Sequence, residues 1–311
     1  MLRIRRFEEK IIELYPAQNM RTPVHLCIGQ EAIAAGVCEN LKRGDYIFTT
    51  HRNHGHCLAK GINIDSLIAE FYGKATGCSR GKGGSMHPVA PECGILGTSA
   101  IVGGCIALAA GTALASRLRR DGKISVAFFG DGAADEGIFH ESLNFAALKN
   151  LPVLFICENN FYATNSPQAA RQPHDNIAKR GASYHIPGVQ VDGNDVLQIF
   201  QTVKKAAARA RVGRGPSLIE CRTYRWKGHV GPDCDYEKGC RPEGELRDWM
   251  RRCPIELFQS HILANKIMSA AEINLFIETI DKELAAAVKY GQESPFPDTT
   301  DLIKNVYYER K

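Results

Sequence analysis

Continuous apolar runs alternate with amphipathic segments through the middle of the chain. The apolar runs predict buried parallel strands, and the segments between them carry apolar residues at helical spacing. The predicted strands are residues 124–129, 153–160, 188–193 and 217–224, and the predicted helices are residues 105–120, 137–149 and 196–211. Strands that alternate with helices indicate a mostly parallel sheet with helices on both faces, which is an α/β fold.

The two ends of the chain are predicted to be mainly helical. Residues 1–72 contain one short predicted strand, "YIFTT", and residues 243–290 precede a tail with Pro295 and Pro297. We find no convincing linker. The expected organisation is therefore a single domain over residues 1–311, with an N-terminal helical segment and C-terminal helices.

A glycine-rich stretch from Gly73 to Gly104 separates the N-terminal helices from the strand–helix units. It shows little periodicity, so it is predicted to be a long, shaped loop. Loops of this length in compact domains are usually functional.

Composition excludes several classes of protein. The chain has 311 residues, 44% of them hydrophobic, and a net charge of +5, as expected of a globular protein. Its basic residues form no stripe interleaved with aromatics, and no apolar run approaches the roughly 20 residues of a membrane span, so neither nucleic acid nor a membrane is an expected partner. The eleven cysteines are dispersed without a C-x-x-C pair, which favours a reducing, cytoplasmic compartment.

The stretch "FFGDGAADEG" reads as a strand end, a glycine turn and a helix start, yet it carries a carboxylate at Asp131. Ligands of parallel sheets bind beyond the carboxyl ends of the strands, and Asn160 follows the next strand. Carboxylate, amide and phosphate oxygens together suit Mg²⁺, while the helix after Gly132 offers N–H groups to an anion. The predicted ligand is thus a metal–diphosphate. A dinucleotide fingerprint is excluded because Asp135 stands where glycine or alanine is needed.

"GDG" followed by "NN" resembles the signature of thiamine diphosphate enzymes. Further segments, among them "HLCIGQEAIAAGV", "HRNHGHCLAKG", "GKGGSMH" and "YRWKGHVG", occur in an order that covers nearly the whole chain. Together they resemble the alpha subunit of the decarboxylating component of 2-oxo acid dehydrogenase complexes, with the pyruvate and acetoin types closer than the branched-chain type.

The resemblance implies roles for particular residues. Asp131, Asn160 and the main-chain carbonyl of Tyr162 would bind Mg²⁺, and Gly132 and Ala133 would contact the diphosphate. Arg52 would grip the diphosphate beside His51, and Ala100 and Val102 would lie along the cofactor rings. His25 and His229 would act at the reaction centre, His229 also touching the cofactor.

The implied activity is the decarboxylation of a small 2-oxo acid, with pyruvate first among the substrates. The glutamate that activates the cofactor would come from a separate beta subunit, in an assembly of two alpha and two beta subunits. The acyl unit would pass to a lipoyl acyltransferase. Two alternatives stay open: acetoin cleavage or acyloin-type transfer to another carbonyl, and a non-catalytic nucleotide-binding module.

The stretch "YRWKGHVGPDCDYEKG", residues 224–239, is predicted to be a mobile loop. It carries three glycines and few large apolar residues, so little burial is expected to hold it. We expect it to become ordered when cofactor and partner bind, which would bring His229 to the cofactor.

Overall fold

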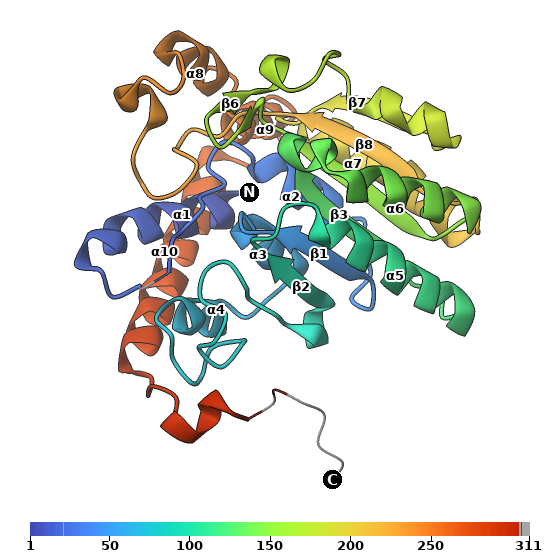
Figure 1. Cartoon of the computed structure of the whole chain (residues 1–311). Coiled ribbons are helices and arrows are strands. Elements are labelled where there is room, and N and C mark those ends of the chain that lie inside the picture. Colours follow the sequence, from blue (N-terminus) through green and yellow to red (C-terminus); the bar gives the residue numbers. More distant parts are fainter. Residues whose placement is uncertain (21, 305, 307–311) are drawn as a thin grey trace.

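The computed structural model describes residues 1–20, 22–304 and 306. Its centre is a six-stranded parallel sheet with the strand order β2-β1-β3-β4-β8-β7 (Figure 1). The strands are β1 (Tyr46–Thr50), β2 (Ile95–Ser99), β3 (Ser125–Gly130), β4 (Val153–Asn159), β7 (Gly188–Asp192) and β8 (Ser217–Arg222). A small antiparallel pair, β5 (Tyr162–Ala163) and β6 (Ser166–Pro167), follows β4.

Ten α-helices in the described part of the chain accompany the sheet. They are α1 (Leu2–Leu14), α2 (Glu31–Cys38), α3 (His54–Lys60), α4 (Ile64–Phe71), α5 (Gly104–Arg119), α6 (Gly137–Leu148), α7 (Val196–Arg211), α8 (Glu243–Met250), α9 (Pro254–Ala264) and α10 (Ala270–Glu293). None of these helices is both long and apolar enough to cross a membrane.

Side chains alternate between the two faces of the sheet, and each face has its own core. Val126 and Phe128 of β3 belong to one buried cluster, together with residues of α1–α4, α7 and α10. Ala127 and Phe129 belong to the other, together with α5 and α6. Because successive strand residues point to opposite faces, a continuous apolar run supplies both cores. The predicted α/β fold with a sheet covered on both faces is confirmed.

The C-terminal region, predicted to be helical, consists of three helices, α8, α9 and α10. Pro254 begins α9, as its fixed φ favours, and Ser269 begins α10 with a capping box that includes Glu272. Helix α10 packs Ile280 and Leu284 into the core shared with α1.

The glycine-rich stretch is more ordered than its sequence predicts, and the expectation of a loop up to Gly104 is wrong for two parts of it. Residues Ile95–Ser99 form the edge strand β2, and α5 begins at Gly104. Before β2, the buried carboxylate of Glu70 accepts hydrogen bonds of 2.7–3.0 Å from the backbone N–H groups of Ser79, Gly81, Gly83 and Gly84. Much of this segment is therefore folded around a single buried charge.

Helix α6 begins at Gly137, where the sequence predicts it, but it does not follow Gly132 directly. A 3-10 segment, Asp131–Asp135, lies between the strand and the helix. The positive end of α6 consequently lies after this segment rather than directly behind Gly132.

Candidate functional site

The carboxyl ends of β1, β3 and β4 meet at a cavity of about 350 Å³. Thr50 ends β1, Gly130 ends β3, and Asn160 directly follows β4. These three strands are neighbours in the sheet. Since they are parallel, they bring side chains from distant parts of the sequence to one edge.

The structure brings together all predicted site residues except His25 and Ala100. Those that line the cavity are His51, Arg52, Val102, Asp131, Gly132, Ala133, Asn160, Tyr162 and His229. His25 lies just behind, with its ring centroid 4.4 Å from that of His51 and 5.2 Å from that of His229. Ala100 is exposed and lies between two lining residues, Ser99 and Val102.

One wall of the cavity carries hard oxygen donors. The Asp131 side chain is buried, and its carboxylate accepts a hydrogen bond from Arg171. The backbone carbonyl of Asp131 accepts one from the side-chain amide of Gln172. Burial raises the pKa of Asp131, and the charge of Arg171 opposes this shift. The Asn160 side chain accepts a hydrogen bond from Tyr162 N (3.3 Å) and donates one to Gln30 (3.2 Å). Asp131, Asn160 and Tyr162 all line the same cavity.

The opposite wall carries a buried cation. Arg52 is only 5% exposed. Its Nη1 donates to Leu26 O (2.7 Å) and its Nη2 to His229 O (3.1 Å), so both terminal nitrogens bond backbone carbonyls rather than a carboxylate. Burial, and next the charge of Arg225, lower the pKa of Arg52 to about 10. This guanidinium remains charged at neutral pH and provides an anchor for an anion.

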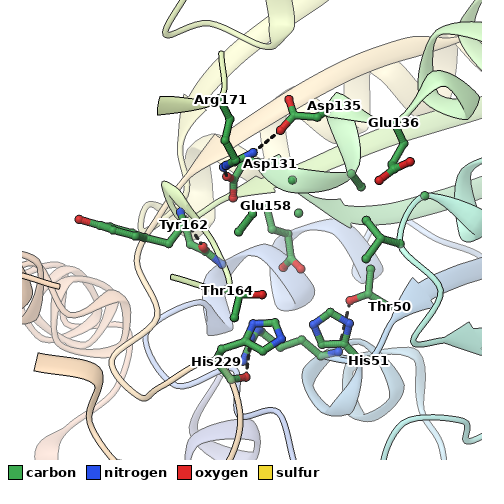
Figure 2. Close-up of a pocket in the computed structure, with 18 of the residues that line it drawn as sticks. Thr50, His51, Asp131, Asp135, Glu136, Glu158, Tyr162, Thr164, Arg171 and His229 are labelled. Carbon is green, nitrogen blue, oxygen red and sulfur yellow. Dashed lines mark hydrogen bonds and ion pairs between the residues drawn. The ribbon is translucent and has the colours of Figure 1, made fainter. Parts of the chain in front are cut away.

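Three histidines gather beside Arg52. One ring nitrogen from each of His25, His51 and His229 lies within 4.8 Å of the other two. Burial, and then the charge of Arg52, lower the pKa of His25 to about 2, of His51 to about 3 and of His229 to about 4. All three rings are therefore neutral at pH 7, and each can donate one hydrogen bond and accept another. Figure 2 shows His51 and His229 side by side at the cavity.

The segment that carries His229 is held by more contacts than its composition suggests. Arg225 is fully buried; its Nη1 donates to Asp235 Oδ2 (2.7 Å), and Arg241 Nε lies 3.2 Å from the same oxygen. Gly231 N donates to Val24 O (2.8 Å). The prediction that little burial holds residues 224–239 is thus incorrect, because the buried ion pairs of Asp235 with Arg225 and Arg241 anchor the segment in place of apolar side chains.

Sequence reasoning missed several cavity residues, of which Glu158 and Arg171 stand out. Glu158 lines the cavity, and its carboxylate accepts a hydrogen bond from His56 Nε2 (3.1 Å). The other ring nitrogen of His56 lies 2.7 Å from Thr49 Oγ1. Its position beside "NN" at a strand end is a signal that the sequence did contain. Arg171 carries no such signal, because it follows β6 in an irregular segment.

Comparison with known sequences agrees with this geometry. Residues 1–300 match the family described as dehydrogenase E1 component. The alpha subunit of the acetoin:2,6-dichlorophenolindophenol oxidoreductase of Bacillus subtilis is 43% identical, over 100% of this chain and 92% of the relative. Two pyruvate dehydrogenase E1 component alpha subunits are also similar. The chloroplastic alpha-3 protein of Arabidopsis thaliana is 38% identical over 99% of this chain and 72% of the relative. The alpha subunit of Rhizobium meliloti is 37% identical over 98% of this chain and 87% of the relative.

Each of these matches spans nearly the whole chain, including the strand ends, the turn Asp131–Asp135 and the segment that carries His229. The cavity and the sequence comparisons thus lead to the same assignment. The chain belongs to the dehydrogenase E1 component family.

Proposed function

We propose that this chain is the alpha subunit of a thiamine diphosphate- and Mg²⁺-dependent enzyme that oxidatively decarboxylates a small 2-oxo acid. One observation carries the proposal. Oxygen donors from Asp131, Asn160 and Tyr162 share a single cavity with the buried cation Arg52. Membership of the dehydrogenase E1 component family supports the choice of thiamine diphosphate as the ligand.

The residues present fit a metal–diphosphate. Arg52 would hold the diphosphate from one side, and the backbone of Gly132 and Ala133 would contact it from the other. Gly132 suits a close approach, because a Cβ at this position would lie 2.7 Å from the Cβ of Ala163. Asp131, Asn160 and the carbonyl of Tyr162 would bind Mg²⁺ through oxygen, as this ion prefers.

The remaining cavity residues orient the ligand and move protons. Thiamine diphosphate supplies an electron sink for decarboxylation when bound. The negative charges of a bound diphosphate and substrate would raise the lowered pKa values of His25, His51 and His229, which could then accept and return a proton near the substrate. The backbone of Ala100 and Val102 would lie along the cofactor rings, and the exposed position of both residues leaves room for this.

Pyruvate is the proposed substrate, and the acyl unit is proposed to pass to a lipoyl acyltransferase. Acetoin cleavage is the second candidate, favoured by the 43% identity to the Bacillus subtilis acetoin enzyme subunit, against 37–38% for the two pyruvate relatives. A screen of 2-oxo acids and acetoin with an artificial electron acceptor, using the chain co-purified with its beta subunit, distinguishes the two. Calorimetric binding of a nucleotide without binding of thiamine diphosphate would instead indicate the non-catalytic module.

A beta subunit is proposed to complete the site, in an assembly of two alpha and two beta subunits. Exposed apolar side chains lie next to the cavity, at Ile101 (75%) and Val102 (48%), and continue along α5 with Leu108 (53%) and Leu118 (74%). Apolar patches of this kind mark interfaces. We propose that this surface contacts the beta subunit.

The isolated chain is therefore expected to turn over at least about 100-fold more slowly than the complex, because the activating group lies on the partner. Leu108→Glu should abolish co-purification with the beta subunit. Val212→Glu, at a more exposed position outside the surface (70%), should leave it intact. Assembly is read by size-exclusion chromatography and turnover by an artificial acceptor. Robust decarboxylation by the chain alone would contradict the requirement for a partner.

The loop of residues 224–239 is expected to respond to ligand. Trypsin should cut at Lys227 and Lys238 more slowly when thiamine diphosphate, Mg²⁺ and the beta subunit are present. Asp235→Ala should speed cutting in every state, because it leaves two buried guanidiniums without their carboxylate, a loss of about 3–5 kcal/mol. Asp233→Ala, which removes only the exposed pair with Lys238, is the matched control. Equal cutting with and without ligands would argue against ligand-linked ordering.

We further propose that residues 1–311 act as one domain in the cytoplasm. The two buried clusters pack against opposite faces of one sheet, which supports a single unit. All eleven cysteines, each within the described residues, are free, which supports a reducing compartment. Cell fractionation tests the location.

A further inference from the structure

The segment that follows β6 returns over the turn Asp131–Asp135 and binds it from outside. Arg171 Nη2 donates to Asp131 Oδ2, and its Nη1 donates to Asp135 Oδ2. The Arg171 side chain is 16% exposed, and that of Asp131 is 2% exposed. Figure 2 shows Arg171 between the two carboxylates at the edge of the cavity. One guanidinium thus joins a buried acid and a more exposed one.

Two further side chains of the same segment hold the backbone of this turn. Gln172 Nε2 donates to Asp131 O (3.0 Å) and to Asp135 Oδ1 (2.7 Å), and Gln172 itself is 5% exposed. Arg180 Nη1 donates to Ala134 O (2.5 Å). The turn is therefore fixed at several points, but only Arg171 contacts the carboxylate of Asp131 among these three.

Arg171 engages one carboxylate oxygen, Oδ2, and leaves the second oxygen to another cation. A metal-binding carboxylate is typically oriented by a hydrogen bond to its other oxygen, and loss of such a contact weakens metal affinity by about 10- to 100-fold. Arg171 also places a positive charge beside Asp131 and Asp135, which reduces their repulsion of a diphosphate. Its second bond, to Asp135, keeps the guanidinium in place.

We propose that Arg171 is a positioning residue for the Mg²⁺–diphosphate, and that it acts by holding Asp131 in the orientation that binds the metal. This proposal rests on the proposed function. It differs from simple competition, in which Arg171 would occupy Asp131 at the expense of the metal. The two mechanisms predict opposite signs for the effect of removing the guanidinium on metal affinity.

The test measures how much Mg²⁺ is needed for binding of thiamine diphosphate to the complex with the beta subunit. Calorimetry at a series of Mg²⁺ concentrations gives the half-maximal value. Arg171→Met should raise this value by about 10- to 100-fold. Arg171→Lys should raise it less, because an ammonium keeps one ion pair but cannot bridge both acids in parallel.

Arg180→Met is the matched control, since it removes an arginine that binds the same turn but does not contact Asp131. It should change the value by less than about threefold. Circular dichroism and size-exclusion chromatography establish that each variant is folded and assembled. Arg171→Gln, which keeps hydrogen-bond donors without the charge, replaces Arg171→Met if that variant fails to fold, with the same expected increase.

The outcomes distinguish an error in the proposed function from an error in the role of Arg171. If the wild-type complex does not bind thiamine diphosphate in a Mg²⁺-dependent way, the proposed function itself is wrong. If it does bind, and the Arg171 variants need the same amount of Mg²⁺ or less than the wild type, the positioning role of Arg171 is overturned.

Discussion

Asp131→Ala is expected to abolish Mg²⁺-dependent binding of thiamine diphosphate, with a loss of affinity of at least about 100-fold. The substitution removes the charged oxygen ligand of the proposed metal site, so the metal that would join the chain to the diphosphate is no longer held. The fold should survive, because Asp131 lies in a turn after β3 and Arg171 retains Asp135 as its partner.

Asn160→Ala should act in the same direction but less severely, because an amide is a neutral ligand. Calorimetry with and without Mg²⁺ measures both effects, and circular dichroism checks the fold. Asp175→Ala, at an exposed acid paired with Arg222, serves as the control and should bind normally. Unchanged cofactor affinity in Asp131→Ala would rule out the assigned metal site.

His229→Ala is expected to lower turnover by about 10²- to 10⁴-fold while changing cofactor affinity by less than about threefold. The ring lies 5.2 Å from His51 and from His25, between centroids, and it is neutral at pH 7. Arg52, Asp131 and Asn160 remain to hold the diphosphate. The effect should therefore fall on proton transfer or acyl transfer rather than on binding.

Turnover and cofactor affinity are measured separately for this variant, with His140→Ala as a control outside the cavity. A second readout is the pH dependence of stability. Since the pKa of His229 is lowered to about 4 from 6.5, the folded protein binds fewer protons than the unfolded chain between these values, so stability falls as pH drops through this window. His229→Ala should make that fall shallower. Normal turnover in the variant would remove the catalytic role.

The sequence alone indicated most strands of the sheet and the edge of the sheet where the candidate site lies. Continuous apolar runs predicted the strands that became β3, β4, β7 and β8, because a strand buried on both faces needs apolar residues at every position. Asp131 and Asn160 were placed together by an argument about strand ends, which holds for any parallel sheet. The resemblance of "GDG" and "NN" to the signature of thiamine diphosphate enzymes then indicated thiamine diphosphate as the ligand to propose.

Tertiary structure decided the features that depend on contacts between distant residues. Strand β2 lies in a glycine-rich stretch and was not predicted from the sequence. It pairs with β1 in the sheet, with Ile95 opposite Ile47. Glu70 holds much of the same stretch through backbone N–H groups, a role that no local pattern predicts. Long-range pairing overrides local propensity in such segments.

The same reason explains the errors at the site. The sequence between residues 224 and 239 contains few apolar side chains, so it gives no sign of being anchored. Arg225 and Asp235 are residue types usually found at the surface, and only the fold shows that they form a buried ion pair. Arg171 follows the small β5–β6 pair, and only the return of the chain over the turn brings it to Asp131. Periodicity records which residues are buried by the hydrophobic effect, whereas charge pairing across the fold depends on geometry that periodicity does not contain.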